Sequence, residues 1–293
     1  MKKGGEGMNQ PNAFKQVWDE IVSPETLPRR FRQVHEIGYE EFRRKVLAQD
    51  PTFVQTAPRN LYAGDTYFIR GAFPRDFMVS LKHRAFEDGR RHPSSFHKVL
   101  EGCPDFNRKI TEDLSDKYSF KYLKHSWYFF PWNDDPLKIF QPVWERWSLI
   151  KFLSGQQLDE YAHHTPKDGV VDRIQIVRYP AGSGMLEPHS DPYLHQPLII
   201  SAYMSKRGED FETGGFYMVG PGDQCIDMED QIEVGDMCIA YATVAHGVEV
   251  VDGHKSVNWD SMDGRWFLGL YSMASDEVSS RHTGQAVKLT SRR

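Results

Sequence analysis

The chain has 293 residues, which is enough to bury a sizeable core in one elaborated domain or two small ones. Its composition is that of an ordinary globular protein, with 39% hydrophobic and 26% charged residues. A net charge of -5 argues against a nucleic-acid-binding protein, because such proteins present a basic face.

The cysteines and the N-terminus indicate the compartment. Cys103, Cys225 and Cys238 form neither a CxxC pair nor an even disulfide framework, which suits a reducing compartment. No apolar run approaches the roughly 20 residues that span a bilayer. The first ten residues, MKKGGEGMNQ, have no apolar stretch behind them, so we expect a disordered tail and not a secretory signal. These features predict a cytoplasmic protein without membrane contact, and they leave its oligomeric state open.

The first half of the chain shows mostly helical patterns. Apolar residues recur at helical spacing over residues 14–48, interrupted by Pro24 and Pro28. The segments that follow alternate between strand and helix character: a strand over 66–73, a helix over 74–91, a strand over 126–132 and a helix over 136–155.

After Asp168-Gly169 short strands separated by glycine and aspartate turns dominate. The expected strands cover residues 173–179, 197–204, 214–219, 237–243, 248–251 and 265–272. Strands at this spacing favour a sandwich or jelly roll. We expect a mainly β fold with flanking helices in a single domain. It would comprise a helical or mixed layer over 1–165, a β core over 166–275 and a C-terminal tail over 276–293.

A metal site is indicated by the loop YPAGSGMLEPHSDP, residues 179–192, which ends in a His-x-Asp triplet. One such triplet is weak evidence by itself. His246, however, follows one strand-like run and precedes another, 57 residues beyond His189. With Asp191, the two imidazoles would fill one face of an octahedral metal and leave three positions open, which favours non-haem Fe(II). Arg265 then opens the strand RWFLGLYS, where a guanidinium can grip a carboxylate with two hydrogen bonds.

With these motifs, residues 172–273 resemble the Fe(II)- and 2-oxoglutarate-dependent dioxygenases, and among them the prolyl-hydroxylase-like branch. Three further features support the resemblance. Tyr179 and its Pro/Gly turn lie ten residues before His189, Tyr203 precedes Gly214-Gly215 by eleven, and a GD turn with an apolar strand leads to His246 in an HGV context.

The resemblance implies a double-stranded β-helix and a role for each residue of the motif. His189, Asp191 and His246 would bind Fe(II). Arg265 would bind the distal carboxylate of 2-oxoglutarate, with Tyr179 and Tyr203 donating hydrogen bonds to it, and O2 would be the second cosubstrate. The halogenases of the family have a small residue in place of Asp191, so its carboxylate favours hydroxylation, desaturation or ring closure over chlorination.

The chain departs from this branch at the anchoring cation, which usually follows the second histidine by nine or ten residues. Lys255 lies nine residues after His246, whereas Arg265 lies nineteen after it. We favour Arg265 because it leads the better strand. Lys255 stays an alternative, and Asn258 a possible helper.

The substrate is poorly specified. Aromatic residues of 122–136 and the loop after Asp191 are expected to border the pocket. The candidate contacts are His195, Tyr193, Trp127 and Trp132. We interpret the chain as a hydroxylase of a small polar metabolite in a biosynthetic pathway, releasing succinate and CO2. Three alternatives remain: a prolyl-type protein hydroxylase, a non-oxidative cupin-type metal- or sugar-binding protein, and a β-sandwich interaction protein without metal. In the last of these, the three ligands would not converge.

Overall fold

A computed structural model describes residues 11–290. The expected disordered tail at residues 1–10, and the last three residues of the predicted C-terminal tail, lie outside the described part.

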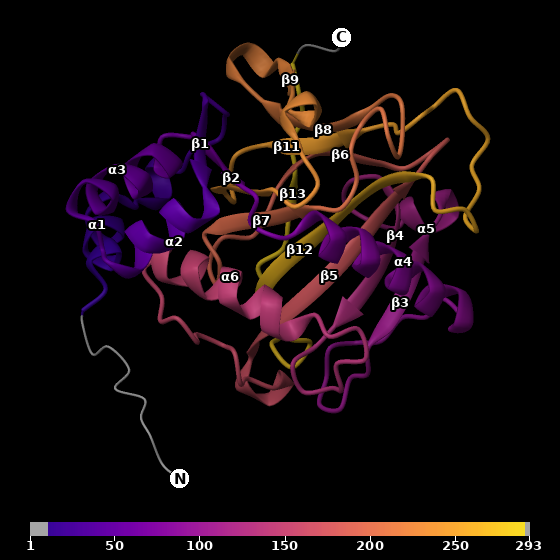
Figure 1. Cartoon of the computed structure of the whole chain (residues 1–293), viewed down its shortest axis with the longest axis horizontal. Coiled ribbons are helices and arrows are strands. Elements are labelled where there is room, and N and C mark those ends of the chain that lie inside the picture. Colours follow the sequence, from indigo (N-terminus) through magenta and orange to yellow (C-terminus); the bar gives the residue numbers. More distant parts are fainter. Residues whose placement is uncertain (1–10, 291–293) are drawn as a thin grey trace.

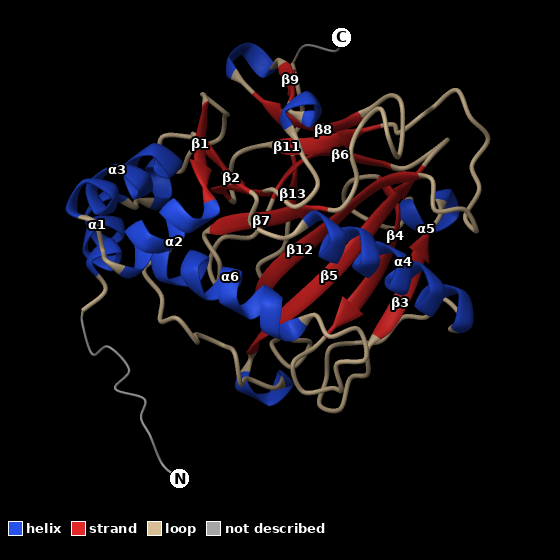
Figure 2. Ribbon diagram, in the orientation of Figure 1, coloured by secondary structure: helices blue, strands red, loops and turns tan. Residues whose placement is uncertain are grey.

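The strands form two sheets, shown in red in Figure 2, that share β4. The larger sheet runs, in order, β1 (Val34–Gly38), β2 (Thr66–Arg70), β10 (Met237–Tyr241), β7 (Leu198–Tyr203), β12 (Gly264–Ala274), β5 (Val170–Pro180), β4 (Tyr122–Phe129) and β3 (Phe106–Ile110). The smaller sheet contains β13 (Gln285–Ala286), β6 (Met185–Ser190), β11 (His246–Glu249), β8 (Gly215–Val219) and β9 (Cys225–Asp227).

The connectivity identifies the fold. From β5 to β12 the chain passes back and forth between the sheets: β5, β7, β10 and β12 lie in the larger one, and β6, β8, β9 and β11 in the smaller one. All pairings among these eight strands are antiparallel. Such alternation between two facing sheets is a double-stranded β-helix, or jelly roll. The predicted fold class, mainly β with flanking helices around this core, is therefore confirmed.

Helices flank the larger sheet (Figure 1). They are α1 (Ala13–Ile21), α2 (Tyr39–Leu47), α3 (Pro51–Tyr62), α4 (Arg75–Arg91), α5 (Glu112–Ser115) and α6 (Phe140–Leu153). Phe86 of α4 packs edge-on against Trp266 of β12, with ring centroids 6.4 Å apart. Lys151 of α6 pairs with the buried Asp172 of β5. Even-numbered positions of β5 and β12 thus face the helices, and the period of two turns odd-numbered positions toward the smaller sheet.

Several element boundaries differ from the expectations. Residues 34–38 form a strand where a helix was expected, because Val34 and Ile37 lie on a segment that pairs in parallel with the edge of β2. The structure also contains α3, β3 and β6, which no pattern predicted, while β4 begins earlier and α6 later than expected. The strand expected at 248–251 begins at His246, so this histidine lies on a strand and not before one.

The C-terminal segment adds to the core. Gln285 and Ala286 pair with Ser190 and His189 of β6. Further along, the backbone N–H of Thr290 donates to a carboxylate oxygen of Asp223, 2.8 Å away. Among residues 11–290 there is no helix with both the length and the apolar character needed to cross a membrane.

Candidate metal centre

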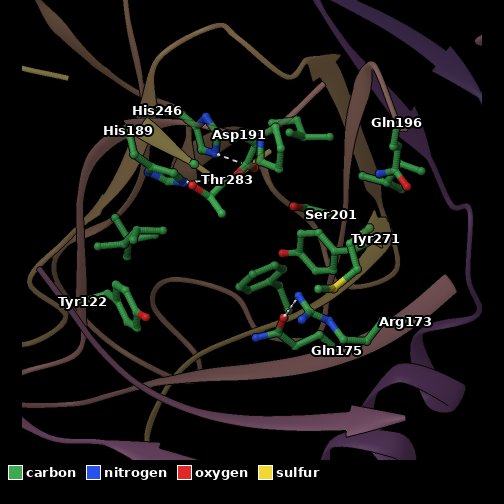
Figure 3. A pocket seen from close by; sticks show the side chains of 18 of the residues that line it. Tyr122, Arg173, Gln175, His189, Asp191, Gln196, Ser201, His246, Tyr271 and Thr283 are labelled. Atoms are coloured by element: carbon green, nitrogen blue, oxygen red, sulfur yellow. Dashed lines mark hydrogen bonds and ion pairs between the residues drawn. The ribbon is translucent and has the colours of Figure 1, made fainter. Parts of the chain in front are cut away.

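The three predicted metal ligands converge in space. His189 is near the end of β6 and His246 begins β11, and the two are direct partners in the register of these antiparallel strands. Asp191 follows β6 by one residue. Its carboxylate oxygens lie 3.5 Å from His189 Nε2 and 3.6 Å from His246 Nε2, and one donor atom from each residue falls within 4.8 Å of the others (Figure 3). This convergence contradicts the interpretation in which the three residues stay apart.

Backbone carbonyl groups orient both imidazole rings. His189 Nδ1 donates to the carbonyl of Glu187 and His246 Nδ1 to that of Val244, both at 3.0 Å. Each Nε2 is then left as the unprotonated nitrogen that points at Asp191. The backbone N–H of Asp191 donates to the carbonyl of Ala242 at 2.9 Å, which ties the ligand loop to the end of β10.

The charges at this site suit a cation. Burial lowers the pKa of His246 to about 4, and the neighbouring His189 adds to this effect. Burial acts to raise the pKa of Asp191, but the hydrogen bond and charge of His189 and the charges of His246 and Lys124 outweigh it and bring the pKa to about 2. At neutral pH Asp191 is therefore an anion beside a neutral His246, which is the protonation state that metal ligands need.

The donor set fits a divalent transition metal. Neighbouring ligands about 2.1 Å from an octahedral ion lie about 3.0 Å from each other. The three donor atoms here lie within 4.8 Å of one another, so they would need to close by no more than about 1.8 Å. Two imidazoles and one carboxylate on one face, with the opposite face toward a cavity, form the ligand set typical of non-haem Fe(II) oxygenases.

A cavity of about 320 Å³ lies between the two sheets and is lined by all three ligand candidates. Arg265, Tyr179 and Tyr203 also line it. Arg265 is the cross-strand partner of Tyr179, and Tyr203 is the partner of Phe267, so the four side chains share the inner face of the larger sheet. Arg265 is only 3% exposed, and its guanidinium carbon lies 5.5 Å from the ring centre of Tyr203.

A buried carboxylate, not found by sequence analysis, holds Arg265 in place. Arg265 Nε donates to Glu229 Oε2 at 2.7 Å, and the backbone N–H of Phe216 donates to the same oxygen. Glu229 belongs to the short 3₁₀ turn Glu229–Gln231, a segment with no sequence signal for function. This pair uses only Nε of the guanidinium, and Arg265 lines the cavity.

The alternative anchor lies elsewhere. Lys255 is on the surface, where its ammonium pairs with Glu212 at 2.8 Å and with Asp252 at 3.0 Å. Asn258 is exposed, and its carbonyl accepts a hydrogen bond from Arg178. Neither residue lines the cavity.

None of the four residues expected to contact substrate lines the cavity, although Tyr193 packs on His282, which does. Trp127 is 1% exposed and stacked on Trp266 between the sheet and α4, because its position on β4 faces the helices. Trp132 stacks on Phe130 and donates to the carbonyl of Cys103. These positions correct the expectation that both tryptophans border the pocket. His195 and Tyr193 follow the ligand loop but are not among the cavity-lining residues either.

Several polar side chains that line the cavity were not predicted from the sequence. Lys124, Arg173, Gln175, Ser201, Tyr271 and Thr283 belong to this group. Phe120 stacks on His189 with ring centroids 4.8 Å apart. The sequence contained a signal for Arg173 and Gln175. In the strand RIQIVRY they alternate with apolar residues, and this period of two places them on the same face as Tyr179.

No protein-family model matches the chain, and no curated protein matches it. Several solved structures are similar in fold. A full-length Neurospora crassa protein, solved in complex with alpha-KG and thymine, is 15% identical with a TM-score of 0.48, covering 93% of this chain and 92% of that one. JOX2 in complex with 2OG, Fe and JA is 12% identical with a TM-score of 0.46, covering 90% of this chain and 81% of that one. A Pseudomonas putida prolyl-4-hydroxylase is 10% identical with a TM-score of 0.43, covering 71% of this chain and 91% of that one. Likeness this low carries no argument about activity, so the function has to be argued from the chain's own site.

Proposed function

We propose that this protein is a non-haem Fe(II)- and 2-oxoglutarate-dependent oxygenase that hydroxylates a small polar metabolite in a biosynthetic pathway. The observation that carries the proposal is the convergence of His189, Asp191 and His246 at the wall of an internal cavity. These three residues would hold the iron. Two imidazoles and one carboxylate leave three coordination positions, enough for a bidentate 2-oxo acid and O2.

Arg265 supports a role for 2-oxoglutarate. Its terminal guanidinium nitrogens, which the pair with Glu229 does not use, would donate two parallel hydrogen bonds to the distal carboxylate, and its buried position makes such charge-assisted bonds strong. Tyr179 and Tyr203 flank it on the same inner face and would donate hydrogen bonds to the cosubstrate. The cupin-type alternative explains the three metal ligands, but in such a binding protein the buried Arg265 would have no function.

The chemistry of the proposed reaction divides between cofactor and protein. When bound, Fe(II) supplies the O2 activation that couples the oxidation of 2-oxoglutarate to succinate and CO2 with insertion of one oxygen atom into a substrate C–H bond. The protein's residues orient the reactants: carbonyl groups fix the imidazole rings, and Arg265 with Glu229 fixes the far end of the cosubstrate. The carboxylate of Asp191 favours hydroxylation over chlorination.

The test is succinate formation from 2-oxoglutarate with Fe(II) and ascorbate under air, for the wild type and for His189→Ala. We expect slow, uncoupled turnover in the wild type and none in the variant. Because some oxygenases turn over only with substrate, 2-oxoglutarate binding to the Mn(II)-loaded protein under argon is measured in parallel. Absence of binding there would contradict the proposal and favour the cupin-type alternative.

A further inference from the structure

A second cation faces the cavity at a distance from Arg265. Arg173 of β5 pairs with Tyr271 of β12, whereas Tyr179 of β5 pairs with Arg265 of β12. The two pairs are six residues apart along the strands. At about 3.3 Å per residue, the backbones of Arg173 and Tyr179 are about 20 Å apart. In Figure 3, Arg173 and Gln175 lie across the cavity from His189, Asp191 and His246. Arg173 is therefore too far away to share the carboxylate that Arg265 would bind.

Arg173 is held in place but not neutralised. Its Nη2 donates to Gln175 Oε1 at 3.0 Å, while Gln175 Nε2 donates to Ser126 Oγ, so hydrogen bonds at both ends of the amide fix the guanidinium. The rings of Tyr128 and Tyr271 lie 5.2 and 5.1 Å from its guanidinium carbon. Its Nε is buried and has no hydrogen-bond partner within the described part of the chain. A buried charge without an anionic partner is costly unless a ligand balances it.

Lys124, on the neighbouring strand β4, adds a second positive charge. Its ammonium lies over the ring of Tyr122, 4.8 Å from the centre. Neither Lys124 nor Arg173 forms an ion pair with a carboxylate within residues 11–290, and Asp191, the acid whose charge acts on both, belongs to the metal centre. Burial lowers the pKa of Lys124 to about 8, and the charge of Arg173 contributes. The wall of the cavity that β4 and β5 form therefore has an excess of positive charge.

We propose that the substrate carries an acidic group, a carboxylate or a phosphate, which Arg173 binds at this wall of the cavity with Lys124 as a second cation. Gln175 and the two tyrosine rings position the guanidinium, and the acid would balance its charge where Arg173 lines the cavity. The inference rests on the proposed function for its meaning as a substrate site. It narrows the substrate from a polar metabolite to an anion whose body reaches from Arg173 toward the metal.

The experiment compares three probes that differ in the head group: phenylacetate, phenyl phosphate and the neutral phenylacetamide. Binding is measured by calorimetry on the Mn(II)-loaded protein saturated with 2-oxoglutarate under argon, so that the cosubstrate site is occupied and no turnover occurs. We expect one of the anions to bind about tenfold tighter than the amide or better, which corresponds to about 1.4 kcal/mol. Comparison of the two anions shows which acid the site prefers.

Arg173→Gln should abolish the preference for the anion and leave 2-oxoglutarate binding unchanged. Arg108→Gln is the matched control, because Arg108 also lies over an aromatic ring, that of Phe96, on the adjacent strand β3 but does not line the cavity. It should keep the preference. Lys124→Gln should reduce the preference for the anion several-fold. If Arg173→Gln fails to fold, the effect of Lys124→Gln tests the anion site in its place.

Equal affinity for the three probes, no saturable binding of either anion up to about 10 mM, or a preference that survives both Arg173→Gln and Lys124→Gln would overturn the inference. Failure of the proposed function gives a different result, since 2-oxoglutarate itself would then not bind. In that case the titrations are repeated without it, and an Arg173-dependent preference would still identify an anion site.

Discussion

At the scale of single residues, Arg265 separates an oxoglutarate enzyme from a simple metal-binding protein. Removing its side chain would leave Glu229 as an unpaired buried charge and lower the free energy of unfolding by about 3–5 kcal/mol. An effect on folding could then not be told from an effect on 2-oxoglutarate binding. Arg265→Lys keeps the charge but loses the two parallel donors. We expect it to raise the KM for 2-oxoglutarate about tenfold while metal affinity stays unchanged.

Lys255→Ala serves as the comparison for Arg265→Lys in the same succinate assay. Its ammonium is already paired with Glu212 and Asp252 on the surface, so its loss should not change the KM. The reverse pattern, a raised KM in Lys255→Ala and an unchanged one in Arg265→Lys, would make Lys255 the anchor and refute the assignment of Arg265.

A second residue, His125, should make the fold sensitive to acid. It is 2% exposed, its Nε2 lies 2.8 Å from Asn107 Oδ1 and its Nδ1 has no partner within residues 11–290. Burial, with the charges of Lys109 and Arg178, lowers its pKa from 6.5 to about 2. Between these pH values the unfolded chain binds a proton that the folded chain does not, so His125 makes the protein less stable as the pH falls below 6.5.

From pH 7 to pH 5 this histidine should account for about 2 kcal/mol of the lost unfolding free energy. His125→Gln, which can still donate to Asn107, should remove most of that loss in urea titrations at the two pH values. His163→Gln changes an exposed histidine and should behave as the wild type. An equally acid-sensitive His125→Gln would show that other groups cause the effect.

At the scale of elements, sequence patterns predicted the strands that are apolar or alternate clearly, and missed those that tertiary pairing creates. Val34 and Ile37 lie three residues apart, which suggests a helix, but their segment forms a strand that pairs with the edge of β2. In α3 the internal Pro58 conceals a helix whose first turn is capped by Asp50. The charge of Glu187 and the missing backbone N–H of Pro188 hide β6 from recognition, although β11 and β13 pair with it on opposite sides.

The C-terminal segment supports the element that carries His189. β13 pairs with β6 at His189 and Ser190, and residues 281–284 line the cavity. Deleting residues 281–293 should expose that edge of β6 while β5 and β12, each paired on both sides, keep their hydrogen bonds. Hydrogen exchange should then speed up in β6 and stay slow in β5 and β12. Unchanged protection of β6 would mean that β13 contributes no stability there.

At the scale of the whole molecule, the motif could be predicted from the sequence but the cavity could not. His189 and Asp191 form a His-x-Asp triplet, and His246 and Arg265 each begin a strand-like run, so one sequence was enough to propose them, although the interval between His246 and Arg265 left Lys255 as an alternative. The cavity depends on which residues of β4, β5, β7 and β12 turn inward, and that follows from the sheet order. The predicted tryptophans fail for this reason: Trp127 occupies the helix-facing side of β4, whereas Lys124, three residues before it, faces the cavity.

The metal should also stabilise the fold as a whole. Its ligands join β6, β11 and the loop after β6, so an ion that binds only the folded chain adds stability by mass action, about 2.7 kcal/mol at a concentration one hundred times its Kd. For a domain of this size that amounts to a rise of several degrees in Tm. Mn(II) or Fe(II) under argon should produce this rise in the wild type, and a chelator should reverse it. His246→Ala should show no response, because two remaining ligands bind the ion too weakly. A Tm that does not depend on metal in the wild type would contradict the assignment of the three ligands, whatever the activity assay shows.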